Sequence, residues 1–316
     1  MLKKTLYSFY EKLRDLRTEK SRNYLRRYKR YQEKNFAKNI HLFKRFEKNL
    51  ETEKLDKFIQ PLWKKDYQRM KETFLDSGFS FLRNPVIRET MFTTKEGKLM
   101  RNEIRFLEEK ISEGKLKYLL EEENIGNPIL SNNKYRTSHN TIHQLYHLIF
   151  YSEASKVNFG KVKRVVEWGG GYGNLARIFK KFNPFQTYTI IDLPTFSCIQ
   201  WVYLSSVFGE KKINFIASIK DKIEEGKINI LPICFLEKIK LHADLFISTW
   251  ALNESSEYSQ NYVIKNKWFG SKNQLLAIQN KIDENFNASP IIDYAKKNSL
   301  KIIPIKNLHG SSYLFK

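Results

Sequence analysis

The stretch RVVEWGGGYGNLARIF, residues 164–179, decides the fold of this 316-residue chain. Its first residues are β-branched and typical of a buried strand, the glycines from Gly169 to Gly173 predict a tight turn, and residues 175–179 place apolar side chains on one face of a helix. Glycine reaches positive φ and lets the backbone approach a ligand, while the helix that follows presents unpaired N–H groups. The stretch therefore predicts a nucleotide-cofactor site.

Two classes of cofactor use such a loop, and the residue before the glycines separates them. Gly171, Gly173 and Ala176 fit the dinucleotide pattern G-x-G-x-x-A. Glu167, however, stands at the end of the strand, where its carboxylate favours a cation over a pyrophosphate. S-adenosylmethionine has a sulfonium, an ammonium and no phosphate, so the charge pattern favours it over NAD.

A second strand, TYTIIDLP at 187–194, continues the same pattern. It ends at Asp192, from which a carboxylate can accept hydrogen bonds from both ribose hydroxyls, and Pro194 is suited to begin a helix. We expect the cofactor to contact the ends of three strands and the glycine loop. The predicted cofactor-binding residues are Glu167, Trp168, Gly169, Gly170, Gly171, Gly173, Asp192, Leu193 and Thr249.

The rest of the C-terminal half alternates strands with helices. Residues 243–250 and 274–282 predict buried strands, and the segments at 212–218 and 227–233 compete for the place of the third central strand. Residues 301–307 and 312–316 flank the turn LHGSS and predict an antiparallel hairpin at the edge of the sheet. This alternation predicts an α/β fold with a mainly parallel sheet and helices on both faces.

Three segments together resemble a known family: VVEWGGGYGNLARIF, IIDLP and DLFISTWALNESS. They are similar to class I S-adenosylmethionine-dependent methyltransferases and, among them, to the bacterial sugar O-methyltransferases. The likeness covers about residues 124–316. It implies a seven-stranded Rossmann-like domain, S-adenosylmethionine as the methyl donor, and a sugar hydroxyl as the acceptor, on a surface glycan, a nucleotide sugar or a related saccharide of polysaccharide biosynthesis.

The N-terminal part differs in kind from the rest. Residues 1–60 hold 18 Lys and Arg against 8 Asp and Glu, part of a formal net charge of +22, and contain no Gly or Pro. Apolar stripes from Leu2 to Leu16 and from Phe36 to Leu50 predict helix. We therefore divide the chain into a basic helical arm at 1–60, a helical cap at 61–155 and a Rossmann-like methyltransferase domain at 156–316.

The basic arm at residues 1–60 has three interpretations. A solvated helical face, a homo-oligomer contact and a peripheral contact with an anionic membrane surface all fit its charge and its Leu2–Leu16 seam. No apolar run approaches the roughly 20 residues of a membrane span, and the N-terminus does not have the pattern of a secretory signal. With two cysteines in apolar contexts, Cys198 and Cys234, these features predict a cytoplasmic protein, with the inner membrane face as an alternative location.

Methyl transfer to a sugar hydroxyl requires a base that removes the hydroxyl proton. The ends of parallel strands bind ligands in such folds, which makes Glu254, after the fourth strand, the first candidate. His309, in the last turn, and His139, before the helix at 140–150, are the other two. His143 and His147 share a helix face with apolar residues, where packing is the commoner role. We expect no metal ion, although a divalent ion that acidifies the hydroxyl is the alternative.

Two other functions fit parts of the sequence. A nucleic-acid methyltransferase, or an O-methyltransferase with a non-sugar small-molecule acceptor, is the alternative enzyme, and the charge of +22 favours the first. The motif N/D-P-P-aromatic of base methylation is replaced after the fourth strand by STWALNES, so a nucleic-acid partner is disfavoured. A structural protein that has lost cofactor binding is disfavoured by the intact Glu167, glycine loop and Asp192.

Overall fold

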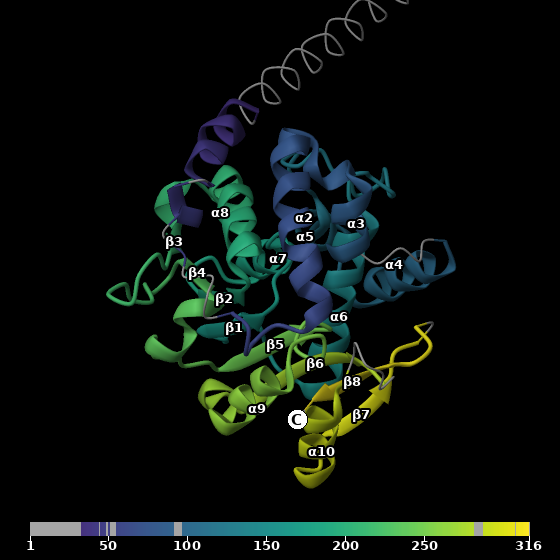
Figure 1. The fold of residues 1–316 in the computed structure, drawn as a ribbon. Coiled ribbons are helices and arrows are strands. Elements are labelled where there is room, and N and C mark those ends of the chain that lie inside the picture. Colours follow the sequence, from purple (N-terminus) through teal and green to yellow (C-terminus); the bar gives the residue numbers. More distant parts are fainter. Residues whose placement is uncertain are drawn as a thin grey trace, which may run out of the picture.

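A computed structural model describes residues 33–43, 45–48, 50, 55–91, 97–280, 287–306 and 308–315. One sheet of eight strands runs through the described part of the chain, in the order β3-β4-β2-β1-β5-β6-β8-β7 (Figure 1). The strands are β1 Arg164–Trp168, β2 Thr187–Asp192, β3 Ile213–Phe215, β4 Ile228–Pro232, β5 Leu245–Thr249, β6 Asn273–Gln279, β7 Lys301–Pro304 and β8 Ser311–Phe315.

The strand order confirms the predicted Rossmann-like fold. The five central strands β4-β2-β1-β5-β6 are parallel and follow the 3-2-1-4-5 order of a doubly wound sheet. Strand β8 is antiparallel to both β6 and β7, which confirms the predicted terminal hairpin. The strand order reverses between β1 and β5, and ligands bind at this switch point in folds of this type.

The sheet has eight strands rather than the expected seven. Residues 212–218 and 227–233 do not compete for one place, because both contribute a strand. β4 is the inner strand beside β2, and the three-residue β3 pairs with β4 at the edge. The apolar side chains of Ile213 and Phe215 are buried there, which explains why this short segment joins the sheet.

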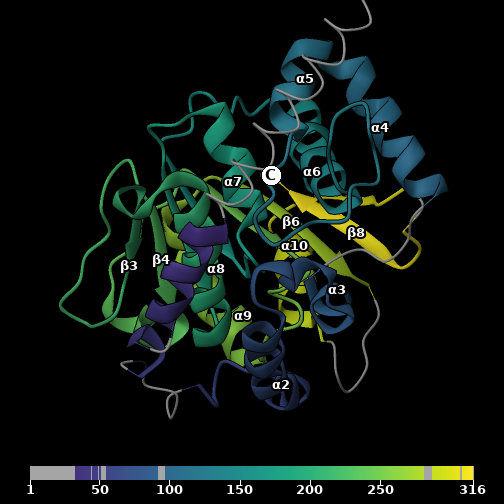
Figure 2. The same ribbon diagram turned by 90° about the horizontal axis from the view of Figure 1, so that it is seen from above.

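Helices cover both faces of the sheet. Figure 1 shows α6, α7 and α8 on one face and α9 and α10 on the other, and Figure 2 shows α4 and α5 beside α6, with α2 and α3 in a separate group. The helices are α2 Pro61–Ser77, α3 Pro85–Met91, α4 Lys98–Lys110, α5 Glu113–Leu120, α6 His139–Ser155, α7 Asn174–Phe182, α8 Pro194–Phe208, α9 Glu257–Lys265 and α10 Ser289–Lys297.

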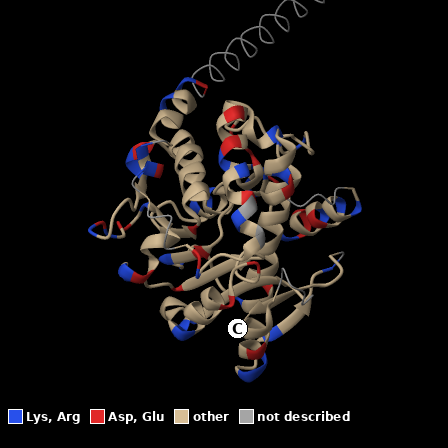
Figure 3. Cartoon of the chain, in the orientation of Figure 1, with Lys and Arg blue, Asp and Glu red and all other residues tan. Residues whose placement is uncertain are grey.

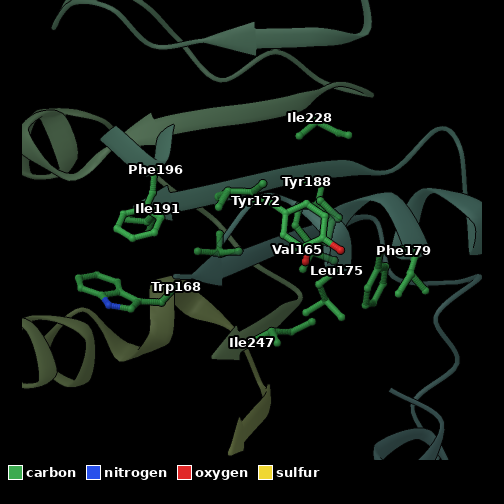
Figure 4. Close-up of a cluster of buried hydrophobic side chains, with 14 of the residues drawn as sticks. Val165, Trp168, Tyr172, Leu175, Phe179, Tyr188, Ile191, Phe196, Ile228 and Ile247 are labelled. Carbon is green, nitrogen blue, oxygen red and sulfur yellow. The ribbon is translucent and has the colours of Figure 1, made fainter. Parts of the chain in front are cut away.

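The core of the domain lies between β1, β2 and α7. Figure 4 shows Leu175 and Phe179 of α7 beside Val165 of β1 and Tyr188 of β2. All four side chains are at most 1% exposed. Burying one large apolar side chain stabilises a fold by about 1.5–3 kcal/mol, so this layer holds the strand and the helix on either side of the glycine loop in place.

The helical segment before α2 packs against the domain. Residues 33–43 and 45–48 are helical, and Phe36 and Phe43 of the predicted stripe are buried. The ring of Phe36 lies 5.9 Å from that of Phe81, and the ring of Phe46 stacks on Phe215 at 4.3 Å. The seam from Leu2 to Leu16 lies outside the described residues. The boundary at residue 60 stays a prediction, but these contacts favour counting residues from 33 onward with the folded body.

Arg177 joins the helical cap to the helix of the glycine loop. Its side chain is fully buried on α7. Nε donates to Asn174 at 2.8 Å, Nη2 to Thr141 of α6 at 3.3 Å, and Nη1 to the carbonyl of Glu121 at 2.9 Å. Nη1 also pairs with the carboxylate of Glu123 at 3.2 Å. A buried guanidinium is costly without such partners, so α6, α7 and the segment after α5 are held as one unit.

Candidate active site

A cavity of about 600 Å³ lies at the carboxyl ends of β1, β2 and β5. Its wall combines the glycine loop, the end of β2, the turn after β5, one face of α6, residues of α2 and α3, and the turn before β8. The cavity brings together most of the residues predicted from the sequence. These are Glu167, Trp168, Gly169, Gly170, Gly171, Asp192, Leu193, Thr249, Glu254 and His309.

The glycines of the loop have two different roles. A Cβ at Gly169 would lie 2.0 Å from Cβ of Ala251, and one at Gly170 would lie 2.5 Å from a methyl of Ile190. Gly171 has φ +56°, and a Cβ there would lie at an ordinary contact distance of 3.8 Å from Met91. The first two glycines therefore let the loop pack closely on the sheet, whereas Gly171 is required by its positive φ.

Gly173 does not line the cavity. It precedes α7 with φ +95°, and a Cβ there would lie 2.8 Å from Leu204 of α8. Sequence reasoning grouped it with the cofactor-binding residues because it completes the glycine pattern. The structure places it behind the loop, where it allows the turn into α7 and the contact with α8.

Two carboxyl groups stand beside the loop, Glu167 buried and Asp192 half-buried. Glu167 accepts a hydrogen bond from the Tyr188 hydroxyl at 2.9 Å, and burial, together with the charge of Asp192, raises its pKa to about 8. Burial also raises the pKa of Asp192 to about 7, although the backbone N–H groups of Leu193 and Gly170 donate to its carboxylate. Carboxyl groups that are costly to ionise in an apolar site gain from a bound cation.

Gln200 links Asp192 to the glycine loop. Its Nε2 lies 2.7 Å from Asp192 Oδ2 and 3.1 Å from the carbonyl of Gly171. The backbone N–H of Gly170 donates to the same carboxylate oxygen at 2.9 Å. The position of the loop relative to the end of β2 is therefore fixed. Sequence reasoning missed Gln200, because a glutamine in the middle of α8 has no distinguishing pattern.

The turn after β5 carries Glu254. Trp250 begins this turn with φ +67°, a conformation that costs a bulky residue about 1–3 kcal/mol. Its carbonyl accepts the N–H of Asn253 at 3.0 Å and that of Glu254 at 3.2 Å. The Glu254 carboxyl has no hydrogen-bond or ion-pair partner among the described residues, and burial raises its pKa to about 7. A carboxyl group of this kind suits a general base near neutral pH.

His143 and His147 of α6 form part of the cavity wall, and they belong to a chain of four buried side chains that includes Glu103 and Tyr313. His143 Nδ1 lies 2.5 Å from Glu103 Oε1, and His143 Nε2 lies 3.0 Å from His147 Nε2. His147 Nδ1 is hydrogen-bonded to the hydroxyl of Tyr313. Both histidines line the cavity, and the ring of His143 stacks on Trp250 at 5.7 Å. Glu103 and Tyr313 lie 40 and 166 residues from their partners, so no local pattern could have found them.

The other two predicted histidines lie in different settings. His139 is 3% exposed, does not line the cavity, and has Nε2 3.4 Å from Glu103 Oε2. The predicted role of His139 as the base is therefore not supported by its place behind the wall. His309 is exposed at the rim of the cavity, in the turn between β7 and β8. Three histidines, four carboxyl side chains and the glycine loop thus line one cavity.

Metal-binding groups and membrane-spanning helices are both absent from the described residues. No group of three or more His, Cys, Asp or Glu side chains in that part of the chain is arranged to hold a metal ion. None of its helices combines the length and the apolar character that crossing a membrane requires.

Comparisons with known proteins complete the description of the site. No protein-family model and no curated protein matches the chain. The structure titled "PigF with SAH" is 11% identical, with 55% of this chain and 57% of that chain covered and a TM-score of 0.36. The mitomycin 7-O-methyltransferase MmcR is 15% identical, with 69% of this chain and 66% of that chain covered and a TM-score of 0.36. An O-methyltransferase family protein from Burkholderia thailandensis is 14% identical, with 73% of this chain and 76% of that chain covered and a TM-score of 0.35.

The chain spans less than two thirds of the length of the first two of these structures.

Proposed function

We propose that the chain is an S-adenosylmethionine-dependent O-methyltransferase. The observation that carries the proposal is the pairing of Glu167 and Asp192 beside the glycine loop, in a cavity that also holds the unpartnered carboxyl of Glu254. Buried carboxyls favour a cationic cofactor over the pyrophosphate of a dinucleotide. Gly171, which lines the cavity with positive φ, is where the loop backbone would approach that cofactor.

The residues divide the chemistry between them. S-adenosylmethionine, when bound, supplies an electrophilic methyl group on a sulfonium. Asp192 would accept hydrogen bonds from the ribose hydroxyls, and Glu167 would favour the positive charge. Glu254 would take the acceptor's proton as the new C–O bond forms and the C–S bond breaks, which leaves a neutral thioether. The proton then passes from Glu254 to solvent when the product leaves.

We infer that the acceptor hydroxyl belongs to a sugar. The resemblance of the three sequence motifs to bacterial sugar O-methyltransferases supports this, and so does the mixed wall of the cavity. Asn140 and Gln144 offer amide groups that can bind hydroxyls, and Trp63 and Trp250 offer apolar faces. We also propose that the chain acts in polysaccharide biosynthesis and that its N-terminal arm makes oligomer or membrane contacts.

Two measurements test the proposal. Isothermal titration calorimetry should show binding of S-adenosylmethionine or its demethylated product and none of NAD. Mass spectrometry of saccharides incubated with the protein and S-adenosylmethionine should then detect the gain of a methyl group. Binding of NAD without binding of S-adenosylmethionine would reverse the assignment, and methylation of a non-sugar hydroxyl alone would overturn only the acceptor class.

A further inference from the structure

The charge of the cavity differs from that of the molecule as a whole. The chain has a formal net charge of +22, and Figure 3 shows Lys and Arg on the outer helices and turns. Among the described residues that line the cavity there is no Lys and no Arg. Four lining side chains are acidic instead. They are Glu89, Glu167, Asp192 and Glu254.

The cofactor accounts for only part of this acidity. Glu167 and Asp192 stand at the glycine loop, where the proposed cofactor has its cationic and ribose groups. Glu254 lies in the turn after β5, Glu89 is exposed on α3, and both line the cavity. The acceptor would therefore meet carboxyl groups from two different elements.

The histidine pair does not supply a positive charge to offset them. The Nε2 atoms of His143 and His147 face each other at 3.0 Å, so one of the two must be without a proton. All three contacts are satisfied when each group donates one proton along the chain. The Tyr313 hydroxyl then donates to His147 Nδ1, His147 Nε2 to His143 Nε2, and His143 Nδ1 to Glu103. In that order both imidazoles are neutral. A single added proton would be balanced by the carboxylate of Glu103.

Burial acts in the same direction on His147. Its pKa is held well below the ordinary value because it is desolvated and because His143 stands beside it. His309 is the other lining imidazole among the described residues, and it is exposed at the rim. The described part of the wall thus offers amides, aromatic rings and carboxyls, and within it there are none of the Arg forks or Lys ammonium groups that bind phosphate.

We propose that the acceptor is a saccharide without phosphate near the reacting hydroxyl, either uncharged or carrying an amine. Nucleotide sugars and glycosyl phosphates are thereby excluded as preferred acceptors. This inference rests on the proposed function. At an effective dielectric constant of about 20, a phosphate charge placed about 6–10 Å from one ionised carboxylate would weaken binding by about 10- to 100-fold.

Matched acceptors test the inference. For each of several hexoses and amino sugars, the methyl glycoside, the 1-phosphate and the uridine-diphosphate derivative are compared in one methylation assay. We expect kcat/KM for the glycoside or the amino sugar to exceed that for its phosphate-bearing counterparts by at least about tenfold. A higher kcat/KM on any nucleotide sugar or 1-phosphate would overturn the inference, while methyl transfer itself would still support the proposed function.

Binding provides a second measurement if no member of the set is turned over. Ligand-detected NMR on the protein loaded with S-adenosylhomocysteine should show the glycosides or amino sugars and not the 1-phosphates or pyrophosphate. Competitive binding of pyrophosphate at the acceptor site would overturn the inference. A failure to bind S-adenosylhomocysteine at all would instead refute the proposed function.

A pair of charge reversals makes the cause specific. Glu89→Lys adds a cation to the cavity lining. It should reduce the ratio of kcat/KM for the glycoside to kcat/KM for its 1-phosphate by several-fold. Glu109→Lys, on the exposed part of α4 outside the cavity, changes the net charge equally and should leave the preference unchanged. Equal effects of the two variants would show that net charge, rather than the lining, sets the preference.

Discussion

The cofactor side and the acceptor side of the cavity are built in different ways. On the cofactor side, Glu167, the glycine loop and Asp192 fall within 26 residues of sequence, and Gly170 bonds directly to Asp192. On the acceptor side, Glu103, His143, Trp250 and Tyr313 come from four distant elements. The cofactor side is thus set by local pattern, and the acceptor side by tertiary packing. Changes on the two sides should therefore affect different constants, affinity for the cofactor and turnover of the acceptor.

The sharpest separation is expected from Glu254→Gln. The amide keeps the size of the side chain but does not take a proton, so kcat should fall by about 10²- to 10⁴-fold. The dissociation constant for S-adenosylmethionine should stay within about twofold, because Glu254 is not part of the loop that binds it. Steady-state kinetics and calorimetry on the same preparation measure both. An unchanged kcat would remove Glu254 as the base and leave His309 as the remaining predicted candidate at the cavity.

The reverse pattern is expected from Asp192→Ala. This change removes the acceptor of the Gly170 and Gln200 hydrogen bonds and the proposed ribose contacts. Affinity for S-adenosylmethionine should weaken by about 1.5–3 kcal/mol, the range for hydrogen bonds to a charged group. At saturating cofactor, kcat should change little. Should a folded variant bind the cofactor as tightly as the unchanged protein, the comparison drawn between the two sides would fail.

A graded effect on cofactor affinity is expected from pH. Burial raises the pKa of Glu167 to about 8 and that of Asp192 to about 7, and a bound cation favours their ionised forms. Affinity for S-adenosylmethionine should therefore weaken as pH falls from 8 to 6, by no more than about tenfold per pH unit for each group. Calorimetric titrations with S-adenosylmethionine between pH 6 and 8 measure this affinity and the number of protons released on binding. Affinity that strengthens at low pH would contradict the role of these carboxyls.

The same shifts predict how stability depends on pH without cofactor. In the unfolded chain these carboxyls ionise near pH 4 to 4.5, below their pKa values in the folded protein. The folded state then holds more protons than the unfolded state between about pH 4 and 8, so the free energy of unfolding falls as pH rises through that window. Denaturant midpoints at pH 5 and pH 8 should show this loss, and saturating S-adenosylmethionine should reduce it.

Sequence periodicity was sufficient for the parts of the molecule that are local. The strand at 164–168, the apolar face of α7 and the terminal hairpin follow from patterns within a few residues. The extra strand β3 was not separable from β4, because both segments are short and apolar. The chain from Glu103 to Tyr313 was hidden for another reason. Its partners meet only after α4, α6 and β8 pack together, and a histidine on an apolar helix face gives no sign of which acid it will meet.

We expect the contacts of Arg177 to limit how the cavity can open. Swinging α6 away would separate its guanidinium from Thr141 and from the segment after α5, and removing a partner from a buried charge costs about 3–5 kcal/mol. The opposite rim is formed by Met91 at the end of α3 and by the exposed His309. We therefore expect spent cofactor to leave past that rim, so that the rate of product release depends on side chains that take no part in the reaction.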